Sequence, residues 1–177
     1  NYVLFVLVVV NTINFVDRMA ISVLAPEIQK EFQVSNTLLG LVMGIAFTAF
    51  YATLGFPVAR MLDRRRRNVM LAAVLAIWSG MTALCGAAMN FVMLFLFRVG
   101  VGVGEAGAGP ASHSLIGDYF RKVDRPAAIG FFSLGVPLGN FLGIFIGGML
   151  VGAIGWRWTF VALGLPGVVM ALVVWLT

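Results

Sequence analysis

Four ionisable residues interrupt stretches of the sequence that are otherwise apolar. Asp17 and Arg18 lie in one stretch, and Arg98 and Glu105 lie in another. Charges inside a bilayer are costly unless they are paired or hydrated, so we expect these side chains to face the interior of a helix bundle. An acid beside an arginine can take up and release a proton, and a freed guanidinium can bind an anionic group. The alternative is a set of buried ion pairs that only fix how the helices pack.

Helical periodicity places these charges on two polar stripes, because residues three, four and seven apart share a helix face. One stripe holds Asn11, Asn14, Arg18 and Ser22, with Asp17 at its edge, and the other holds Arg98, Gly102, Glu105, Gly109 and Ser112. Two such stripes predict a water-filled cavity. Asp17 and Glu105 are the candidate proton-binding residues. The candidate substrate-binding residues or charge partners are Arg18, Arg98, Asn14 and Asn11.

Counting along the helices predicts which charges meet. Asp17 and Arg98 lie nine and eight residues from the outer ends of their stretches. At about 1.5 Å per residue they reach a similar depth, so we expect them to pair. Glu105 lies about 10 Å further toward the cytoplasm, where a bent Arg18 side chain can reach it.

The composition is that of a membrane protein. Hydrophobic residues make up 61% of the sequence and charged residues 11%, with a mean hydropathy of +1.02, values foreign to a domain with an ordinary solvated surface. The net charge of +5 comes from two short basic clusters between apolar runs, so we expect no nucleic-acid partner. A single cysteine, Cys85, and a single histidine, His113, offer neither a disulfide framework nor a metal site. We expect no metal and no cofactor.

Six apolar stretches are long enough to cross a bilayer as helices, since the hydrocarbon core takes about 20 residues. They cover residues 2–25, 38–62, 69–89, 91–116, 127–154 and 158–177. The expected fold class is an all-α membrane protein whose residues 1–177 form one bundle of six transmembrane helices. We expect Pro26 to end the first helix, a short polar helix to follow at 27–33, and Ser35, Asn36 or Thr37 to cap the second.

Lysine and arginine in the connections predict the orientation, because cytoplasmic loops carry an excess of them. One side holds Arg60, Arg64, Arg65, Arg66, Arg67, Arg121, Lys122 and Arg125, and the other holds Lys30 and Arg157. We therefore expect a multi-pass protein of a bacterial inner membrane or an equivalent one, surrounded by lipid, with a cytoplasmic amino terminus. The sequence lacks an initiating methionine and stops inside an apolar stretch, so we expect it to be a segment of a longer protein.

Small and aromatic residues predict how the helices pack. Four glycines recur every four residues in the fifth stretch: Gly135, Gly139, Gly143 and Gly147. They predict a ridge against another helix, with a local bend at Pro137. Glycines at alternate positions around Gly102 mimic part of a dinucleotide loop, but no strand precedes them, so close helix packing is the better interpretation. Trp156 and Trp158 are expected to lie at the membrane interface.

Several of these motifs resemble the major facilitator superfamily of transporters. They are Asn14-Phe-Val-Asp-Arg18, Arg98-x-x-x-Gly102-x-Gly104-Glu105-Ala106, Gly135-Val-Pro137-Leu-Gly139 and Gly155-Trp-Arg-Trp158. The second connection resembles that superfamily's cytoplasmic signature in Asp63 and Arg64, although Ala59, Arg66 and Asn68 depart from it. The resemblance implies a cytoplasmic gate of Asp63, Arg64 and Arg67. It also implies alternating access, two inverted three-helix repeats, and a carboxyl-terminal six-helix half outside this chain.

Within the superfamily, the segment from Gly104 to Phe120, followed by Gly130 and residues 134–139, is similar to the Spinster family. This resemblance implies proton-coupled movement of an anionic amphiphile, such as a lysolipid or sphingosine phosphate. Symporters of sugar acids and carboxylates share the charge pairs and are the alternative. Asp118, directly before Tyr119, favours the Spinster family.

Two other classes fit less well. An intramembrane enzyme needs a nucleophile beside a base, and Ser112 and His113 point apart because they are adjacent on a helix. We therefore expect no enzymatic activity. A receptor or an assembly subunit explains the hydrophobic helices but not the buried acids opposite buried arginines.

Overall fold

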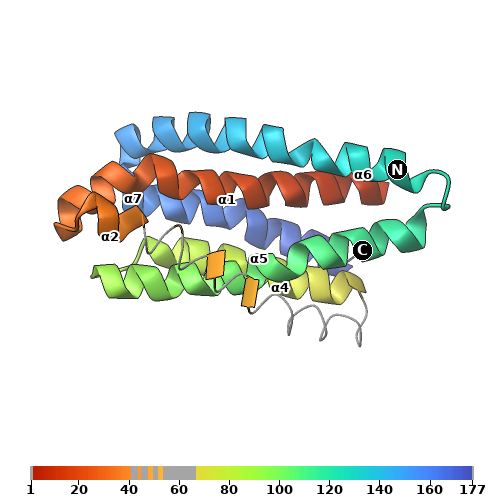
Figure 1. Ribbon diagram of the computed structural model, residues 1–177, viewed down its shortest axis with the longest axis horizontal. Coiled ribbons are helices and arrows are strands. Elements are labelled where there is room, and N and C mark those ends of the chain that lie inside the picture. The colour runs from red at the N-terminus through yellow and green to blue at the C-terminus, as the bar shows by residue number, and fades with distance from the viewer. Residues whose placement is uncertain (1, 41–43, 45–47, 50–51, 54–66, 177) are drawn as a thin grey trace.

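The computed structural model describes residues 2–40, 44, 48–49, 52–53 and 67–176. Every secondary-structure element in these ranges is a helix, and Figure 1 shows the long helices lying side by side along one axis. The helices are α1 (Tyr2–Phe32), α2 (Asn36–Gly40), α4 (Arg67–Cys85), α5 (Phe91–Tyr119), α6 (Arg125–Ser133) and α7 (Gly135–Leu176). Most of the expected second span, residues 38–62, lies outside the described residues.

Four helical stretches of the described chain are long and apolar enough to cross a membrane. They are Tyr2–Phe32, Arg67–Cys85, Phe91–Tyr119 and Arg125–Leu176. The last one doubles back at Gly155, so its two limbs run in opposite directions (Figure 1). Gly155 has φ 75° and ψ 166°, a conformation that glycine adopts at little cost. The limbs correspond to the expected fifth and sixth spans.

The expected fifth span, 127–154, is not one uninterrupted helix. It is divided at Leu134, where α6 ends and α7 begins. Pro137 explains the interruption, because a proline has no N–H to donate to the carbonyl of Ser133 and its ring crowds that carbonyl. Leu134 keeps helical backbone angles, φ −61° and ψ −23°, so the bend expected at Pro137 stays a prediction.

The expectation that Pro26 ends the first helix is wrong. Helix α1 continues through Pro26 to Phe32, although the proline removes one hydrogen bond of the helix. Contacts with other helices explain this, because Leu24 and Ile28 on either side of Pro26 are both fully buried. The cap expected for the next helix is present, since the Ser35 hydroxyl accepts a hydrogen bond from the N–H of Leu38 at 3.1 Å.

Glycines allow the helices to approach closely. A Cβ built on Gly135 would lie 2.8 Å from the Cβ of Asn11, and one on Gly143 would lie 2.8 Å from the Cβ of Met19. The glycines of α7 that face α1 are all buried: Gly135, Gly139, Gly143 and Gly147. Gly102 is buried in α5. The cavity described next is thus bordered by a helix α1 that is held tightly against the first limb of α7.

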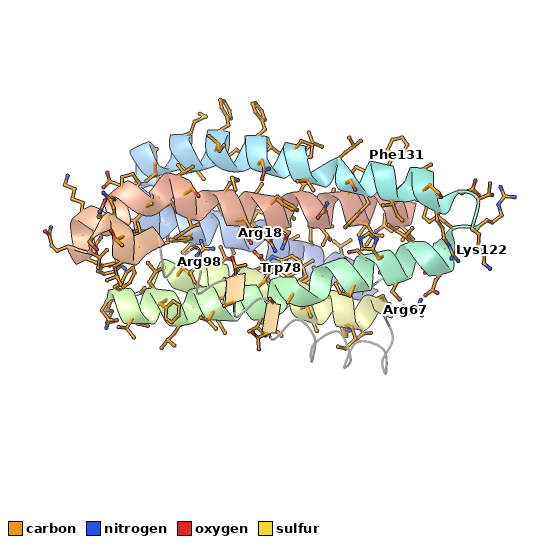
Figure 2. The ribbon with its side chains drawn as sticks, viewed as in Figure 1. Arg18, Arg67, Trp78, Arg98, Lys122 and Phe131 are labelled. Atoms are coloured by element: carbon orange, nitrogen blue, oxygen red, sulfur yellow. The ribbon has the colours of Figure 1, made fainter. Side chains whose placement is uncertain are left out.

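Basic residues at the start of α4 and in the connection between α5 and α6 lie at one end of the bundle, while Lys30 and Arg157 lie at the other. Figure 2 shows Arg67 and Lys122 at the end where the described chain starts and stops, while Arg18, Arg98 and Trp78 lie in its middle. This separation follows the expected asymmetry of the connections. Which side of the membrane that end faces stays a prediction.

Candidate functional site

A polar cavity of about 130 Å³ lies between α1, α5 and α6. Its polar lining comes from Asn11, Asn14 and Arg18 of α1 and from Glu105 and Ser112 of α5. Phe132 of α6 closes one side. Part of each polar stripe expected from helical periodicity thus lines a common cavity, whereas Ser22, Arg98 and Gly102 are not among its lining residues.

Arg18 and Glu105 form an ion pair across this cavity. The Nε atom of Arg18 donates to Oε2 of Glu105 at 2.8 Å. The Glu105 side chain is fully buried, whereas 30% of the Arg18 side chain is exposed. The Arg18 guanidinium also lies 5.4 Å from the ring centre of Phe15. One member of the pair is therefore accessible to a solute while the other is shielded.

Asp17 is fully buried next to this pair, but its partner is not the expected one. The hydroxyl of Thr82, from α4, donates to Oδ2 of Asp17 at 3.3 Å. No ion pair joins Asp17 to Arg98, although both residues are described. The expected Asp17–Arg98 pair is thus wrong for this conformation. Axial counting set the depth of Asp17 correctly but not the direction in which its carboxylate points.

Arg98 is buried between the two acids without pairing with either. Its guanidinium carbon lies 4.8 Å from the ring centre of Phe160, and only 4% of the residue is exposed. Its positive charge interacts electrostatically with both Asp17 and Glu105. Within the described chain, Nε and Nη2 of Arg98 have no hydrogen-bond partner. Arg98 is thus a buried arginine near both acids, and its Nε and Nη2 donors are not used within the described chain.

The two asparagines on α1 play different parts. Asn14 lines the cavity and is 6% exposed. Asn11 also reaches the cavity, but its side-chain N–H donates to the carbonyl of Phe132 at 2.9 Å. That bond ties α1 to the end of α6, next to the interruption at Leu134. Asn11 therefore links the cavity wall to the α6–α7 junction.

Sequence reasoning missed the contribution of α4. Trp78, Ser79 and Thr82 are all fully buried in this helix. The signal that could have found them is a group of residues with polar atoms in an otherwise apolar helix. Positions 78 and 79 each lie about one turn before position 82, so they share a region of the helix surface with it. With them the buried polar centre draws on α1, α4 and α5.

The residues expected to form the cytoplasmic gate fall partly outside the described chain. Asp63 and Arg64 lie outside the described residues. Arg67 forms an ion pair with Asp118 at the end of α5, and its Nη1 donates to the carbonyl of Ser114 at 3.1 Å. Arg125 donates to the carbonyls of Gly117 at 2.6 Å and Phe120 at 3.1 Å. These arginines satisfy the last carbonyls of α5.

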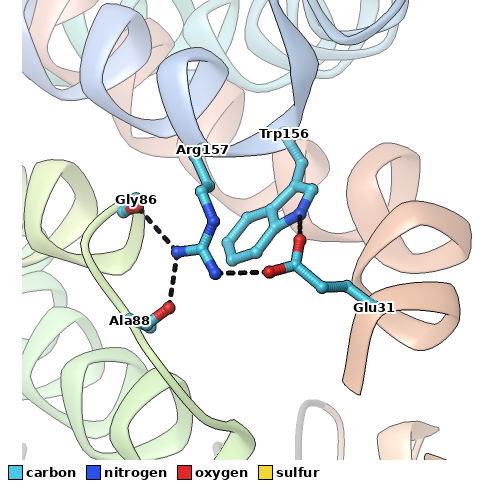
Figure 3. Close-up of polar contacts among 5 residues, drawn as sticks. All are labelled: Glu31, Gly86, Ala88, Trp156 and Arg157. Atoms are coloured by element: carbon cyan, nitrogen blue, oxygen red, sulfur yellow. Dashed lines mark hydrogen bonds and ion pairs between the residues drawn. The ribbon is translucent and has the colours of Figure 1, made fainter. Parts of the chain in front are cut away.

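A second polar cluster ties together the opposite end of the bundle (Figure 3). Glu31 accepts from the indole N–H of Trp156 at 2.7 Å and from Nη2 of Arg157 at 2.5 Å. Arg157 also donates to the carbonyls of Gly86 and Ala88. Trp156 is 5% exposed, so it packs inside the bundle, and the membrane-interface position expected for it stays a prediction. Trp158, in contrast, is 67% exposed.

The isolated histidine does not join the charged centre. His113 is exposed on α5 and packs edge-on against Phe132, with ring centres 5.4 Å apart. Over the described ranges, no group of three or more histidine, cysteine, aspartate or glutamate side chains is arranged to hold a metal ion.

The fold and the site define a class: an integral, multi-pass helical membrane protein with a charged cavity inside its bundle. Residues 7–177 match the family model of the Major Facilitator Superfamily. The chain therefore belongs to the major facilitator superfamily, a family of transporters. This confirms the superfamily expected from the sequence motifs.

Comparison with known relatives shows which members of the superfamily this chain is similar to. A bacterial homolog of the human lysosomal transporter Spinster, solved in an inward-facing and occupied conformation, is 40% identical with a TM-score of 0.87, and the match covers 99% of this chain and 43% of that one. An MFS-type efflux pump of Mycolicibacterium smegmatis is 39% identical, over 94% of this chain and 39% of the pump. The resemblance is to an amino-terminal half of the Spinster-like type.

Two further relatives represent the two expected substrate classes. The sphingosine-1-phosphate transporter SPNS2 of Danio rerio is 31% identical, over 84% of this chain and 30% of the relative. A probable L-galactonate transporter of Escherichia coli is also 31% identical, over 90% of this chain and 35% of the relative. The chain thus spans about two fifths or less of the length of these relatives.

Proposed function

We propose that the full-length protein is a proton-coupled secondary active transporter that moves an anionic amphiphile, such as a lysolipid or sphingosine phosphate. The observation that carries this proposal is the Arg18–Glu105 pair. Its guanidinium is partly open to the cavity, while its carboxylate is fully buried. A guanidinium matches phosphate and carboxylate groups in geometry, so Arg18 is the binding group for the anionic head.

The same pair supplies the coupling. Protonation of Glu105 removes the negative charge that holds Arg18, and the arginine then binds the anionic head group. Loss of the proton restores the pair and expels the anion. Asp17 and Arg98 provide a second acid and a second arginine at similar depth. Proton binding and substrate binding are therefore linked through a shared set of charges.

Apolar surface next to the cavity supports an amphiphile. Among the described residues, a groove of about 430 Å³ is lined by apolar side chains: Leu4, Phe5, Val8, Phe131, Leu134 and Leu138. Phe131 faces this groove, and its neighbour Phe132 faces the polar cavity. In this proposal the charged head binds in the cavity and the apolar tail lies in the groove, which a sugar acid would leave empty.

Alternating access completes the proposal. In it, the described helices and the second span form a rigid unit of two inverted three-helix repeats, and a carboxyl-terminal half closes the other side of the cavity. The amino terminus is cytoplasmic. Asp63, Arg64 and Arg67 form the cytoplasmic gate, and the ion pair of Arg67 with Asp118 supports that role.

Transport of a carboxylate such as a sugar acid is the second candidate. It is supported by the similarity to the probable L-galactonate transporter and by the hydroxyl and amide groups of Ser112 and Asn14 in the cavity. Those groups can bind sugar hydroxyls. The apolar groove has no role in this candidate, which makes the two distinguishable.

The test is flux in proteoliposomes that contain the full-length protein. Radiolabelled lysophosphatidate and radiolabelled galacturonate are each measured with an imposed pH gradient, in wild type and in two variants. Phe131→Ser alters the groove, and Phe141→Ser alters a comparably exposed phenylalanine of α7 outside it. We expect lysophosphatidate flux that falls severalfold in Phe131→Ser alone. Galacturonate flux that is indifferent to both variants would establish the second candidate, and flux of neither solute would refute both.

A further inference from the structure

Thr82 departs from the behaviour of the other threonines in these helices. Thr12, Thr48, Thr53 and Thr159 each donate to the carbonyl four residues earlier in their own helix. This is the usual way in which a threonine hydroxyl is satisfied inside an apolar helix. Thr82 instead donates across the bundle to Asp17 at 3.3 Å. An interhelical bond to a fully buried carboxylate takes the place of the local one.

Trp78, one turn before Thr82, faces the same carboxylate. Its indole nitrogen and Oδ1 of Asp17 are both buried, and neither has a hydrogen-bond partner within the described chain. The indole N–H is among the groups that interact with the Asp17 carboxylate. Gly104 of α5 holds this tryptophan in place. A Cβ on Gly104 would lie 2.7 Å from the Cβ of Trp78, so α5 packs directly against it.

We propose that Thr82 and Trp78 are positioning residues of α4 that hold the Asp17 carboxylate and set the pH at which it binds its proton. This inference rests on the proposed proton coupling and adds residues to it. Donors directed at a carboxylate favour its charged form. The other titratable groups around Asp17 in the described part of the chain are Arg98, Glu105 and Cys85.

The experiment measures the pH profile of lysophosphatidate exchange by the full-length transporter at equal pH on both sides. Thr82→Val keeps the shape of the side chain and removes the donor, whereas Thr82→Ser keeps the donor. Thr159→Val is the matched control, because Thr159 is equally buried but bonds only to its own helix. We expect the midpoint of the profile to move upward by about one pH unit in Thr82→Val, as loss of a hydrogen bond to a charged group predicts. Thr82→Ser and Thr159→Val should keep the wild-type midpoint.

Trp78→Phe provides a second route if Thr82→Val does not yield folded protein. It removes the indole N–H and keeps an aromatic ring, and we expect the same upward direction. An unchanged midpoint in Thr82→Val, or in Trp78→Phe where that variant replaces it, overturns the inference. Asp17→Asn separates this failure from failure of the proposed function. If Asp17→Asn shows the wild-type profile, Asp17 is not a coupling residue, the present inference falls, and the proposed coupling then rests on Glu105 alone; if it alters the profile while the α4 variants do not, only the present inference falls.

Discussion

Replacing Gly139 with alanine tests the closest approach between α1 and α7. A Cβ at this position would lie 2.5 Å from the carbonyl oxygen of Thr12 and 2.5 Å from the Cβ of Phe15. Neither atom can move away by a change of rotamer, so the two helices must separate. Overpacking of this kind costs about 1–3 kcal/mol. Because neither contact can relax, we take the upper half of that range, about 2–3 kcal/mol, and alanine regains roughly 0.5–1 kcal/mol through its better helix propensity, which leaves a net loss of about 1–2 kcal/mol.

Thermal unfolding of the purified protein in detergent measures this loss. A loss of that size lowers Tm by roughly 2–8 °C in a protein of 150–250 residues, and by less in a longer one. Gly148→Ala is the matched control, because it lies in the same limb of α7 and no heavy atom would come within 4 Å of its Cβ. We expect its Tm to stay the same or rise. An equal Tm change in the two variants would refute the close packing of α1 against α7.

Two further substitutions test the charged clusters. Arg18→Lys should lower anion transport at least about tenfold, because a lysine cannot form the planar two-point contact of a guanidinium; a normal rate would mean that Arg18 only fixes helix packing. Glu31→Gln should reduce the free energy of unfolding by about 1 kcal/mol or less and therefore lower Tm modestly, because the Glu31 side chain and its partner Arg157 are 43% and 37% exposed. Glu27→Gln, at an exposed position outside the ion pairs of the described residues, should leave Tm unchanged, and an equal effect of both would contradict a specific role for Glu31.

Which ionisable residues form the charged centre could be predicted from the sequence, because charges in apolar stretches are costly. The Arg18–Glu105 pair followed from spacing along two helices, and it is present at 2.8 Å. The partner of Asp17 could not be predicted in the same way. Helical rise fixes depth but not the rotation of one helix against the next, and at that depth both Thr82 and Arg98 surround Asp17.

Local signals also failed where contacts between helices override them. Pro26 is a strong helix-ending signal, yet α1 continues for another six residues because buried side chains lie on both sides of it. The burial of Trp156 could not be predicted either, because Glu31 lies opposite its indole N–H and the ring packs between Phe32 and Phe160. In both cases the deciding partner is more than one hundred residues away or on another helix.

Proton-driven flux through variants of the two buried acids tests the central claim most directly. Asp17→Asn and Glu105→Gln mimic the protonated carboxyls, and each is compared with wild type in proteoliposomes with and without a pH gradient. The account predicts that each variant retains exchange of labelled substrate but loses its acceleration by the gradient. If both variants keep the wild-type response to the gradient, these charges are structural pairs and proton coupling through this centre is contradicted.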